Sequence, residues 1–182
     1  MSMQIAGDEQ LHLGLKEMIR NVPDYPKAGV VFKDITPLLK DPHAFEQVVE
    51  AIAAHYREQQ IDYVVGIESR GFIFGAAVAL ALRAGFIPVR KPGKLPHETH
   101  RCEYALEYGT DALEIHRDAV ETGKRVLIVD DVLATGGTAA AAVELVQCTG
   151  GHVAGLAFLI ELGFLDGRAK IPGIDVVSLL TY

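Results

Sequence analysis

The sequence lacks the features that mark disulfide-rich or membrane-spanning proteins. Its two cysteines, Cys102 and Cys148, stand far apart and in no metal-ligand spacing, so we expect two free thiols in a reducing compartment. No basic segment leads into an apolar one near the N-terminus, which predicts that there is no signal peptide. The most apolar stretch, residues 71–82, is well short of the ~20 residues that span a bilayer. We therefore expect a cytoplasmic protein with no membrane partner.

An excess of positive charge is also missing. The formal net charge is −7, and the basic residues are scattered along the chain rather than gathered into a run. This pattern disfavours an extended nucleic-acid surface, so any anion site must be local. Repeats, low-complexity tracts and linkers are absent too, and 182 residues suit one domain with an ample core. We expect a single domain over residues 1–182.

Strand-like and helix-like segments alternate along the chain. Short runs of aliphatic and β-branched residues predict strands, and apolar residues at helical spacing predict helices. This alternation is typical of an α/β fold with a central, mostly parallel sheet, helices on both faces and ligands at the carboxyl ends of the strands. Pro88 favours either a sheet edge or the beginning of a strand for its segment. The expected strands cover residues 62–67, 87–90, 126–129, 153–160 and 175–180, and the expected helices cover residues 11–22, 42–56, 71–82 and 138–146.

Residues 22–37 do not follow this alternation. Three prolines and a glycine within the segment forbid a long helix and predict a fixed, irregular path. Phe32 stands out there, between polar neighbours. From the pattern alone, its ring fits two roles, a core anchor or a platform for a planar ligand, and the pattern favours the core anchor.

Residues 91–116 are polar and rich in turns, yet they contain alternating apolar patches. Two interpretations fit this mixture, a hairpin-like flap over a site and an ordinary excursion of the sheet. His97 and His100 lie in this segment without a matching third ligand or a helical setting. We interpret them as solvated loop residues rather than metal ligands.

An apolar run at residues 126–129 leads directly into a candidate ligand loop. Asp130 and Asp131 follow the run, and the sequence Ala-Thr-Gly-Gly-Thr follows at residues 134–138. Glycines let the backbone approach an anion, and amides at a helix start donate to it. The two carboxylates suit either the vicinal hydroxyls of a sugar or Mg²⁺. Together, these features indicate a site for a ribose phosphate.

A second candidate anion site follows the strand at residues 62–67. Glu68, Ser69 and Arg70 form a turn before the apolar helix, and Arg70 at a helix start suits a second phosphate group, although a surface ion pair is an alternative. The turn nearly matches the Gly-x-Ser-x-Gly elbow of hydrolases, but Ile67 occupies the first glycine position. Neither a P-loop nor a dinucleotide-binding motif is present at residues 134–138, which argues against a nucleotide triphosphatase or a dehydrogenase.

The carboxylate pair followed by Ala-Thr-Gly-Gly-Thr resembles the phosphoribosyl pyrophosphate signature of type I phosphoribosyltransferases. Further segments at residues 31–37, 68–72, 90–96 and 106–109 resemble those of the adenine phosphoribosyltransferase family, and together they cover nearly the whole chain. The resemblance implies the type I phosphoribosyltransferase fold, with an N-terminal hood at about residues 22–37 and a flexible catalytic loop at about residues 92–116. It also implies a purine salvage reaction, in which adenine and phosphoribosyl pyrophosphate give AMP and pyrophosphate, in a homodimer.

The same resemblance implies a role for each matched residue. Mg²⁺ is the implied cofactor, held by substrate and water near Asp130 and Asp131 rather than by the protein directly. Glu107 is implied to transfer the proton of the base, with Tyr108 beside it and Arg70 acting at the pyrophosphate. The implied substrate-binding residues are Val31, Phe32, Lys33, Ser69, Lys91, Lys94, Asp130, Asp131, Ala134, Thr135, Gly136, Gly137, Thr138 and Leu162.

The resemblance implies a separate group of these residues for each part of the two substrates. Residues 134–138 are implied to hold the 5′-phosphate and the two aspartates to face the ribose hydroxyls. Arg70, Lys91 and Lys94 would hold the pyrophosphate. Adenine is implied to lie between Phe32 and Leu162, with backbone groups around Val31 and Lys33 reading its polar edge, which reverses the preference for a core anchor at Phe32.

Two other functions compete with this interpretation. A regulator that senses phosphoribosyl pyrophosphate without catalysis usually binds nucleic acid, and the acidic charge and single-domain length do not favour this. A related enzyme for xanthine, guanine or orotate is disfavoured by the hood and loop resemblance. A 6-oxopurine site usually needs a donor for the oxo group, and no lysine is close to Leu162 in the sequence.

Overall fold

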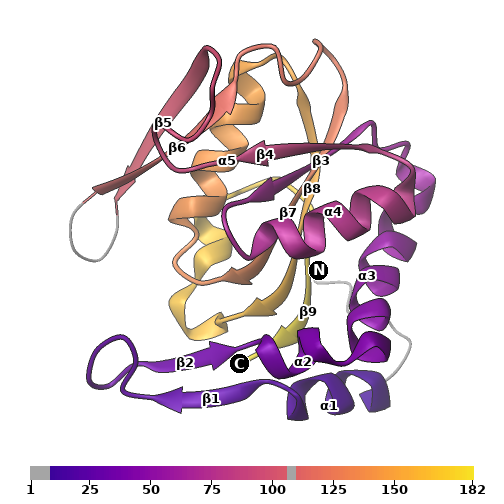
Figure 1. The fold of residues 1–182 in the computed structure, drawn as a ribbon, viewed down its shortest axis with the longest axis vertical. Helices are drawn as coiled ribbons and strands as arrows, with labels where there is room; N and C mark the ends of the chain where they lie inside the picture. Colours follow the sequence, from indigo (N-terminus) through magenta and orange to yellow (C-terminus); the bar gives the residue numbers. More distant parts are fainter. Residues whose placement is uncertain (1–8, 106–109) are drawn as a thin grey trace.

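The computed structural model describes residues 9–105 and 110–182, and a five-stranded parallel sheet forms its centre (Figure 1). The strand order is β4-β3-β7-β8-β9, and every pair of neighbours is parallel, as the alternation of elements predicts. The strand with Pro88 lies at one edge, which is one of the two expected positions. The strands are β3 (Tyr63–Ile67), β4 (Gly85–Val89), β7 (Arg125–Leu133), β8 (His152–Glu161) and β9 (Val176–Thr181).

Helices cover both faces of this sheet, because its central strands are apolar on both sides. On β7, Leu127 and Val129 belong to the core beneath α3 (Pro42–Tyr56) and α4 (Gly71–Leu82). The alternate residues Val126 and Ile128 belong to the core beneath α5 (Gly137–Cys148). None of the helices in the described ranges is long and apolar enough to cross a membrane.

Local sequence signals fix several element boundaries. Asp41 caps α3, since its carboxylate accepts hydrogen bonds from the amides of His43 and Ala44 at 3.0 and 2.9 Å. Pro42 occupies the first turn of that helix, where no amide donor is needed. Both cysteines are free thiols, as predicted. The short elements are α2 (Thr36–Lys40), η1 (Arg57–Gln59), η2 (Gly163–Leu165) and η3 (Gly167–Lys170).

The N-terminal region differs from the sequence prediction. The helix α1 (Glu9–Glu17) ends five residues before Val22, which instead lies in β1 (Arg20–Pro23) and pairs with Phe32 of the antiparallel strand β2 (Val31–Asp34). Residues 22–37 are therefore largely a β-hairpin rather than an irregular path. Gly29 turns this hairpin at a φ of 84°, and its amide donates to the Asp24 carboxylate at 2.8 Å.

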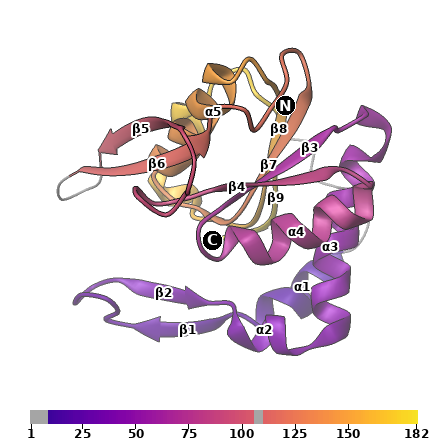
Figure 2. The ribbon, with the colours of Figure 1, turned by 45° about the horizontal axis from the view of Figure 1, so that its top comes forward.

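A second hairpin lies within residues 91–116, which fits the predicted hairpin-like shape of this segment. Strands β5 (Thr99–Ala105) and β6 (Thr110–His116) pair antiparallel, with Tyr104 opposite Asp111. The β5–β6 hairpin packs on α5. Both hairpins project to the left in Figure 1 and Figure 2, with β1–β2 at the bottom of the view and β5–β6 above it.

Two glycines of the chain offer a test of this packing. A Cβ at Gly155 on β8 would lie 2.6 Å from the buried Tyr56 hydroxyl, closer than real contacts allow. That hydroxyl donates to the Leu156 carbonyl at 3.2 Å, so the ring cannot move without losing a bond. In contrast, Gly14 of α1 has open space around its Cβ position.

We predict opposite effects for alanine at these two positions. Gly155→Ala overpacks the core beside Tyr56 and should lower the free energy of unfolding by about 1–3 kcal/mol. Gly14→Ala removes a flexible residue from a helix interior and should raise it by about 0.5–1 kcal/mol. Urea unfolding followed by circular dichroism measures both changes. A Gly155→Ala variant as stable as the parent would contradict the packing described for Tyr56.

Candidate functional site

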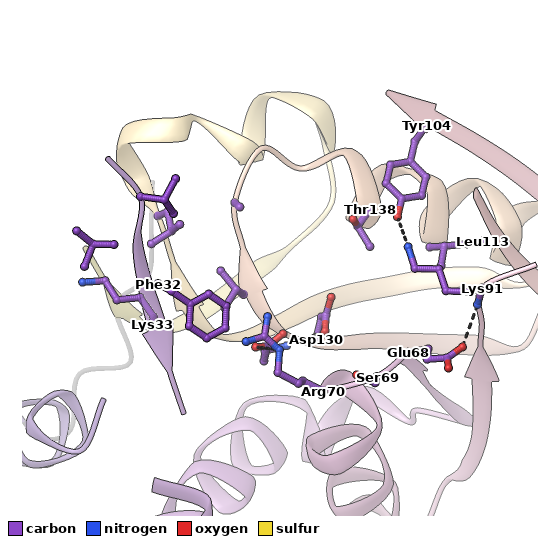
Figure 3. A pocket seen from close by; sticks show the side chains of 16 residues that line it. Phe32, Lys33, Glu68, Ser69, Arg70, Lys91, Tyr104, Leu113, Asp130 and Thr138 are labelled. Atoms are coloured by element: carbon purple, nitrogen blue, oxygen red, sulfur yellow. Dashed lines mark hydrogen bonds and ion pairs between the residues drawn. The ribbon is translucent and has the colours of Figure 1, made fainter. Parts of the chain in front are cut away.

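A cavity of about 450 Å³ opens at the carboxyl ends of β3 and β7 (Figure 3). Its walls come from the β1–β2 hairpin, the loop before α4, the end of β7 and the inner side of the β5–β6 hairpin. Carboxyl ends of parallel strands are the expected place for ligands in such a sheet. The cavity is lined by Val30, Val31, Phe32, Lys33, Glu68, Ser69, Arg70, Lys91, Tyr104, Leu113, Asp130, Asp131, Val132, Ala134, Thr138 and Leu162.

Residues 134–138 form a tight turn between β7 and α5. Gly136 has a φ of 78°, and a Cβ there would lie 2.2 Å from the carbonyl oxygen of Gly167, so only glycine fits. The first amides of α5 have no acceptor within the helix, which makes this turn an anion site. A smaller cavity of about 60 Å³ adjoins the main one here, and Ala134, Thr135, Gly136, Gly137 and Thr138 all line it.

Asp130 and Asp131 lie within β7, not after its end as the sequence suggested. The strand continues to Leu133 because β8 pairs with it as far as Glu161. Burial raises the pKa of Asp130 well above its ordinary value, and the neighbouring Asp131 carboxylate adds to this. Burial also raises the pKa of Asp131, although Arg70 opposes that shift. The pair is therefore held ready for a positively charged or hydrogen-bond-donating partner.

Arg70 connects this carboxylate pair to the β1–β2 hairpin. It precedes α4, and its Nε lies 2.9 Å from Asp131 Oδ2. This contact has the distance of an ion pair without hydrogen-bond geometry, and within the described ranges Asp131 Oδ2 has no hydrogen-bond partner. The other side of the guanidinium faces the Phe32 ring, 5.1 Å from its centroid. Gly71 permits the approach, because a Cβ there would lie 2.8 Å from Asp130 Oδ1.

Lys91 lies on the opposite side of the cavity, against the β5–β6 hairpin. Its Nζ donates to the Asp111 carboxylate and to the Tyr104 hydroxyl, the latter at 3.1 Å (Figure 3). Burial lowers the pKa of Lys91, but the two hydrogen bonds outweigh it and raise the pKa above the ordinary lysine value. The lysine is therefore fully charged at neutral pH.

Glu68 accepts hydrogen bonds from two further cationic side chains, Arg90 and Lys94. Its carboxylate accepts from Lys94 Nζ at 2.7 Å, from the Lys91 amide at 3.0 Å and from the Arg90 guanidinium at 3.2 and 3.3 Å. Burial alone would raise the pKa of Glu68, but these donors together lower it to about 2. Lys94 is consequently held beside Glu68 and does not line the cavity.

Phe32 on β2 and Leu162, which follows β8, both line the cavity. The Tyr25 ring meets Phe32 edge-on at 5.2 Å between centroids, which supports the outer side of the platform. Lys33 turns its side chain away from the cavity, since Nζ donates to Asn21 at 2.6 Å and lies 4.0 Å from the centroid of Tyr182 (Figure 3). Only backbone atoms of Lys33 therefore remain for a ligand.

The structure brings together most of the residues predicted from the sequence. The main cavity is lined by Val31, Phe32, Lys33, Ser69, Arg70, Lys91, Asp130, Asp131, Ala134, Thr138 and Leu162, and the adjoining one by Thr135, Gly136 and Gly137. Lys94 lies outside both. Glu107 and Tyr108 lie outside the described residues.

Sequence reasoning missed Glu68, Tyr104 and Asp111 as members of the site. Glu68 was detectable, because it stands directly after a predicted strand in a loop that already contained Ser69 and Arg70. Tyr104 and Asp111 become neighbours only through the register of the β5–β6 hairpin, which the sequence does not reveal. Their joint contact with Lys91 follows from that register.

Metal ligands are few in this site. In residues 9–105 and 110–182, no group of three or more histidine, cysteine, aspartate or glutamate side chains is placed to hold a metal ion. Asp130 and Asp131 nevertheless both line the cavity and supply carboxylate oxygens, and among the described residues Asp131 Oδ2 has no hydrogen-bond partner besides its ion pair with Arg70. Such oxygens suit a hard cation such as Mg²⁺, which takes its remaining ligands from substrate phosphates and water.

The sequence and the fold are similar to those of known phosphoribosyltransferases. The phosphoribosyl transferase domain family matches residues 38–172. An adenine phosphoribosyltransferase of Solibacter usitatus (strain Ellin6076) is 61% identical over 168 residues, which cover 92% of this chain and 97% of that protein.

Solved structures of adenine phosphoribosyltransferases are also similar to this chain. The adenine phosphoribosyltransferase of Thermoanaerobacter pseudethanolicus is 54% identical and superposes with a TM-score of 0.91 over 94% of this chain and 99% of its own. The enzyme of Saccharomyces cerevisiae, solved with adenine and an imino-altritol bisphosphate, is 44% identical with a TM-score of 0.89, over 93% of this chain and 98% of its own. The chain therefore belongs to the adenine phosphoribosyltransferase family.

Proposed function

We propose that this chain catalyses the reaction of adenine with phosphoribosyl pyrophosphate to give AMP and pyrophosphate, in purine salvage. One observation carries the proposal: a single cavity holds an aromatic platform, a buried carboxylate pair, an anion-binding turn and two cations. These are the partners that a base, a ribose, a 5′-phosphate and a pyrophosphate need. The family membership and the names of the relatives point to the same reaction.

The sugar phosphate is bound along the end of β7. The amides of residues 134–138 and the hydroxyls of Thr135 and Thr138 hold the 5′-phosphate. Asp130 and Asp131 accept hydrogen bonds from the ribose hydroxyls. Arg70 and Lys91, with Ser69 between β3 and α4, hold the pyrophosphate group, and Lys94 joins them when it leaves Glu68.

Phosphoribosyltransferases use Mg²⁺ together with phosphoribosyl pyrophosphate. When bound, the metal ion would neutralise negative charge on the pyrophosphate group. In this chain, oxygens of the substrate and of water would hold it, beside Asp130 and Asp131. A bound cation favours the ionised form of both carboxylates, which opposes the upward shift of their pKa values by burial.

The base lies between Phe32 and Leu162. Both residues line the cavity, and stacking on an aromatic face accepts any planar base. Selection of adenine then depends on backbone donors and acceptors around Val31 and Lys33. This assignment explains why Lys33 can turn its side chain toward Asn21 and Tyr182.

In the chemical step, the bond from C1′ to pyrophosphate breaks as a ring nitrogen of adenine bonds to C1′. Positive charge develops on the ribose, and the adjacent carboxylate of Asp130 stabilises it. Arg70 and Lys91 stabilise the negative charge that passes to pyrophosphate. The proton of the attacking nitrogen passes to Glu107, with Tyr108 next to it in the sequence.

We further propose that the chain is one catalytic domain in a cytoplasmic homodimer. The β1–β2 hairpin acts as its hood, at about residues 22–37, and residues 92–116 act as its catalytic loop. Residues of both hairpins line the cavity, which supports this division.

The proposed reaction is tested by measuring pyrophosphate release. The protein is incubated with phosphoribosyl pyrophosphate, Mg²⁺ and adenine, guanine or hypoxanthine in turn. Release with adenine should exceed that with either 6-oxopurine by at least about a hundredfold, because a site built to hydrogen-bond one base edge leaves groups unpaired with another. No release with adenine would refute the proposed reaction.

Replacing Phe32 tests the base platform. Base–aromatic stacking is worth about 1–3 kcal/mol, so Phe32→Ala should raise the KM for adenine by about 5- to 150-fold. The KM for phosphoribosyl pyrophosphate should change less, through the contact of Phe32 with Arg70. Phe164→Ala is the matched control, because Phe164 is 75% exposed and two residues from Leu162. Equal effects of the two variants on the adenine KM would exclude the platform.

Replacing Glu107 tests proton transfer. Glu107→Gln removes the acceptor while keeping the side-chain shape, and it should lower kcat by about 10²- to 10⁴-fold. The affinity for phosphoribosyl pyrophosphate, measured by calorimetry, should be unchanged. Glu103→Gln on the same hairpin is the control, since this exposed side chain pairs only with Arg101 among the described residues. Parallel losses of turnover and affinity in Glu107→Gln would rule out the role in proton transfer.

A further inference from the structure

An ion pair closes the loop that follows β8. Arg168 Nε donates to Glu161 Oε1 at 2.7 Å, and Nη2 donates to Oε2 at 2.6 Å, which is the forked geometry of the strongest arginine–carboxylate pairs. The same guanidinium donates to the Val176 carbonyl at 2.8 Å and reaches Ser178 Oγ at 3.4 Å. It is therefore fixed to the ends of two neighbouring strands.

One end of this loop carries the base platform. Leu162 directly follows Glu161, and its side chain lines the main cavity. Its amide donates to the Leu133 carbonyl at 2.9 Å, so the residue is fixed to the last position of β7. A shift of the Glu161 end would thus move the wall on which the base rests.

The other end of the loop supports the anion-binding turn. Gly167 directly precedes Arg168, and a Cβ on Gly167 would lie 2.3 Å from the Ala134 carbonyl oxygen and 3.1 Å from the Gly136 amide nitrogen. The backbones of the two turns are thus in direct contact. Any displacement of Arg168 is transmitted through Gly167 to the turn that is proposed to hold the 5′-phosphate.

Other bonds hold the loop in the fold without this pair. The Gly163 amide donates to the Tyr182 carbonyl at 3.0 Å, the Asp166 amide to the Gly163 carbonyl at 3.2 Å, and the Ile171 amide to the Arg168 carbonyl at 3.0 Å. Loss of the ion pair should therefore leave the loop folded but less exactly placed. Its consequences should appear in ligand binding before they appear in stability.

We propose that Arg168 and Glu161 are positioning residues. They fix the position of the base platform at Leu162 relative to the phosphate turn at residues 134–138. This inference rests on the proposed function, because it concerns the two substrates of that reaction. Neither side chain lines the cavity, so both act through their neighbours Gly167 and Leu162. A displacement of about 1 Å in such supports is enough to weaken binding or turnover substantially.

Steady-state kinetics of Arg168→Gln tests the inference. The KM values for adenine and phosphoribosyl pyrophosphate should both rise about tenfold, with a smaller change in kcat, because both binding walls lose their common support. Arg168→Lys keeps the charge without the fork and should show an intermediate rise of about threefold. The Glu161→Gln/Arg168→Gln double variant should be no worse than the more affected single variant, since the two residues act as one unit.

The control is Arg57→Gln, which breaks an exposed arginine–glutamate pair of 2.9 Å to Glu50 on α3 and should leave both KM values unchanged. Unchanged KM values in Arg168→Gln, a rise in only one of them, or a loss of thermal stability alone would each overturn the inference. Should Arg168→Gln fail to fold, the two KM values of Arg168→Lys test the inference instead, and unchanged values would overturn it. An inactive parent protein would instead refute the proposed function, so the two failures are distinguishable.

Discussion

Two adjacent carboxylates in the middle strand of the sheet impose the constraint on which the site depends. Burial of charge is costly unless a partner of opposite sign is present, and two neighbouring carboxylates repel each other in addition. Arg70 relieves part of this cost at Asp131. To reach it, the β3–α4 connection must lie directly on β7, which Gly71 permits because it has no side chain to meet Asp130.

The same arginine organises the opposite wall of the cavity. Its guanidinium lies over Phe32, so the β1–β2 hairpin is placed by a group that also neutralises the carboxylates. Base platform and ribose site are thus built around one side chain. Arg70 thereby sets the distance between them from the turn before α4, which favours precise binding of a ligand that must touch both.

Each cation proposed to meet pyrophosphate already has a carboxylate partner. Arg70 is paired with Asp131, Lys91 with Asp111, and Lys94 with Glu68. Carboxylate and phosphate oxygens accept the same charge-assisted hydrogen bonds, so substrate binding replaces one acceptor by another. The cations are consequently oriented before the substrate arrives, and the low pKa of Glu68, about 2, reflects the same arrangement.

Features encoded by short segments could be predicted from the sequence. The cap at Asp41, the edge strand with Pro88 and the glycine turn at residues 136–137 each follow from local chemistry, and the structure contains all three. Val22 was misassigned because its spacing from Leu15 and Met18 suits a helix, whereas pairing with Phe32 decides its conformation. The acceptors of Lys91 depend on hairpin register, which no local pattern encodes.

A crystal structure of the protein with bound AMP tests the central claim most directly. AMP carries both the base and the 5′-phosphate, so it must contact the platform and the turn at once. The account predicts adenine between Phe32 and Leu162, with phosphate oxygens at about 2.7–3.2 Å from the amides of residues 134–138. A base bound away from Phe32, or a phosphate bound at Lys91 instead of that turn, would contradict it.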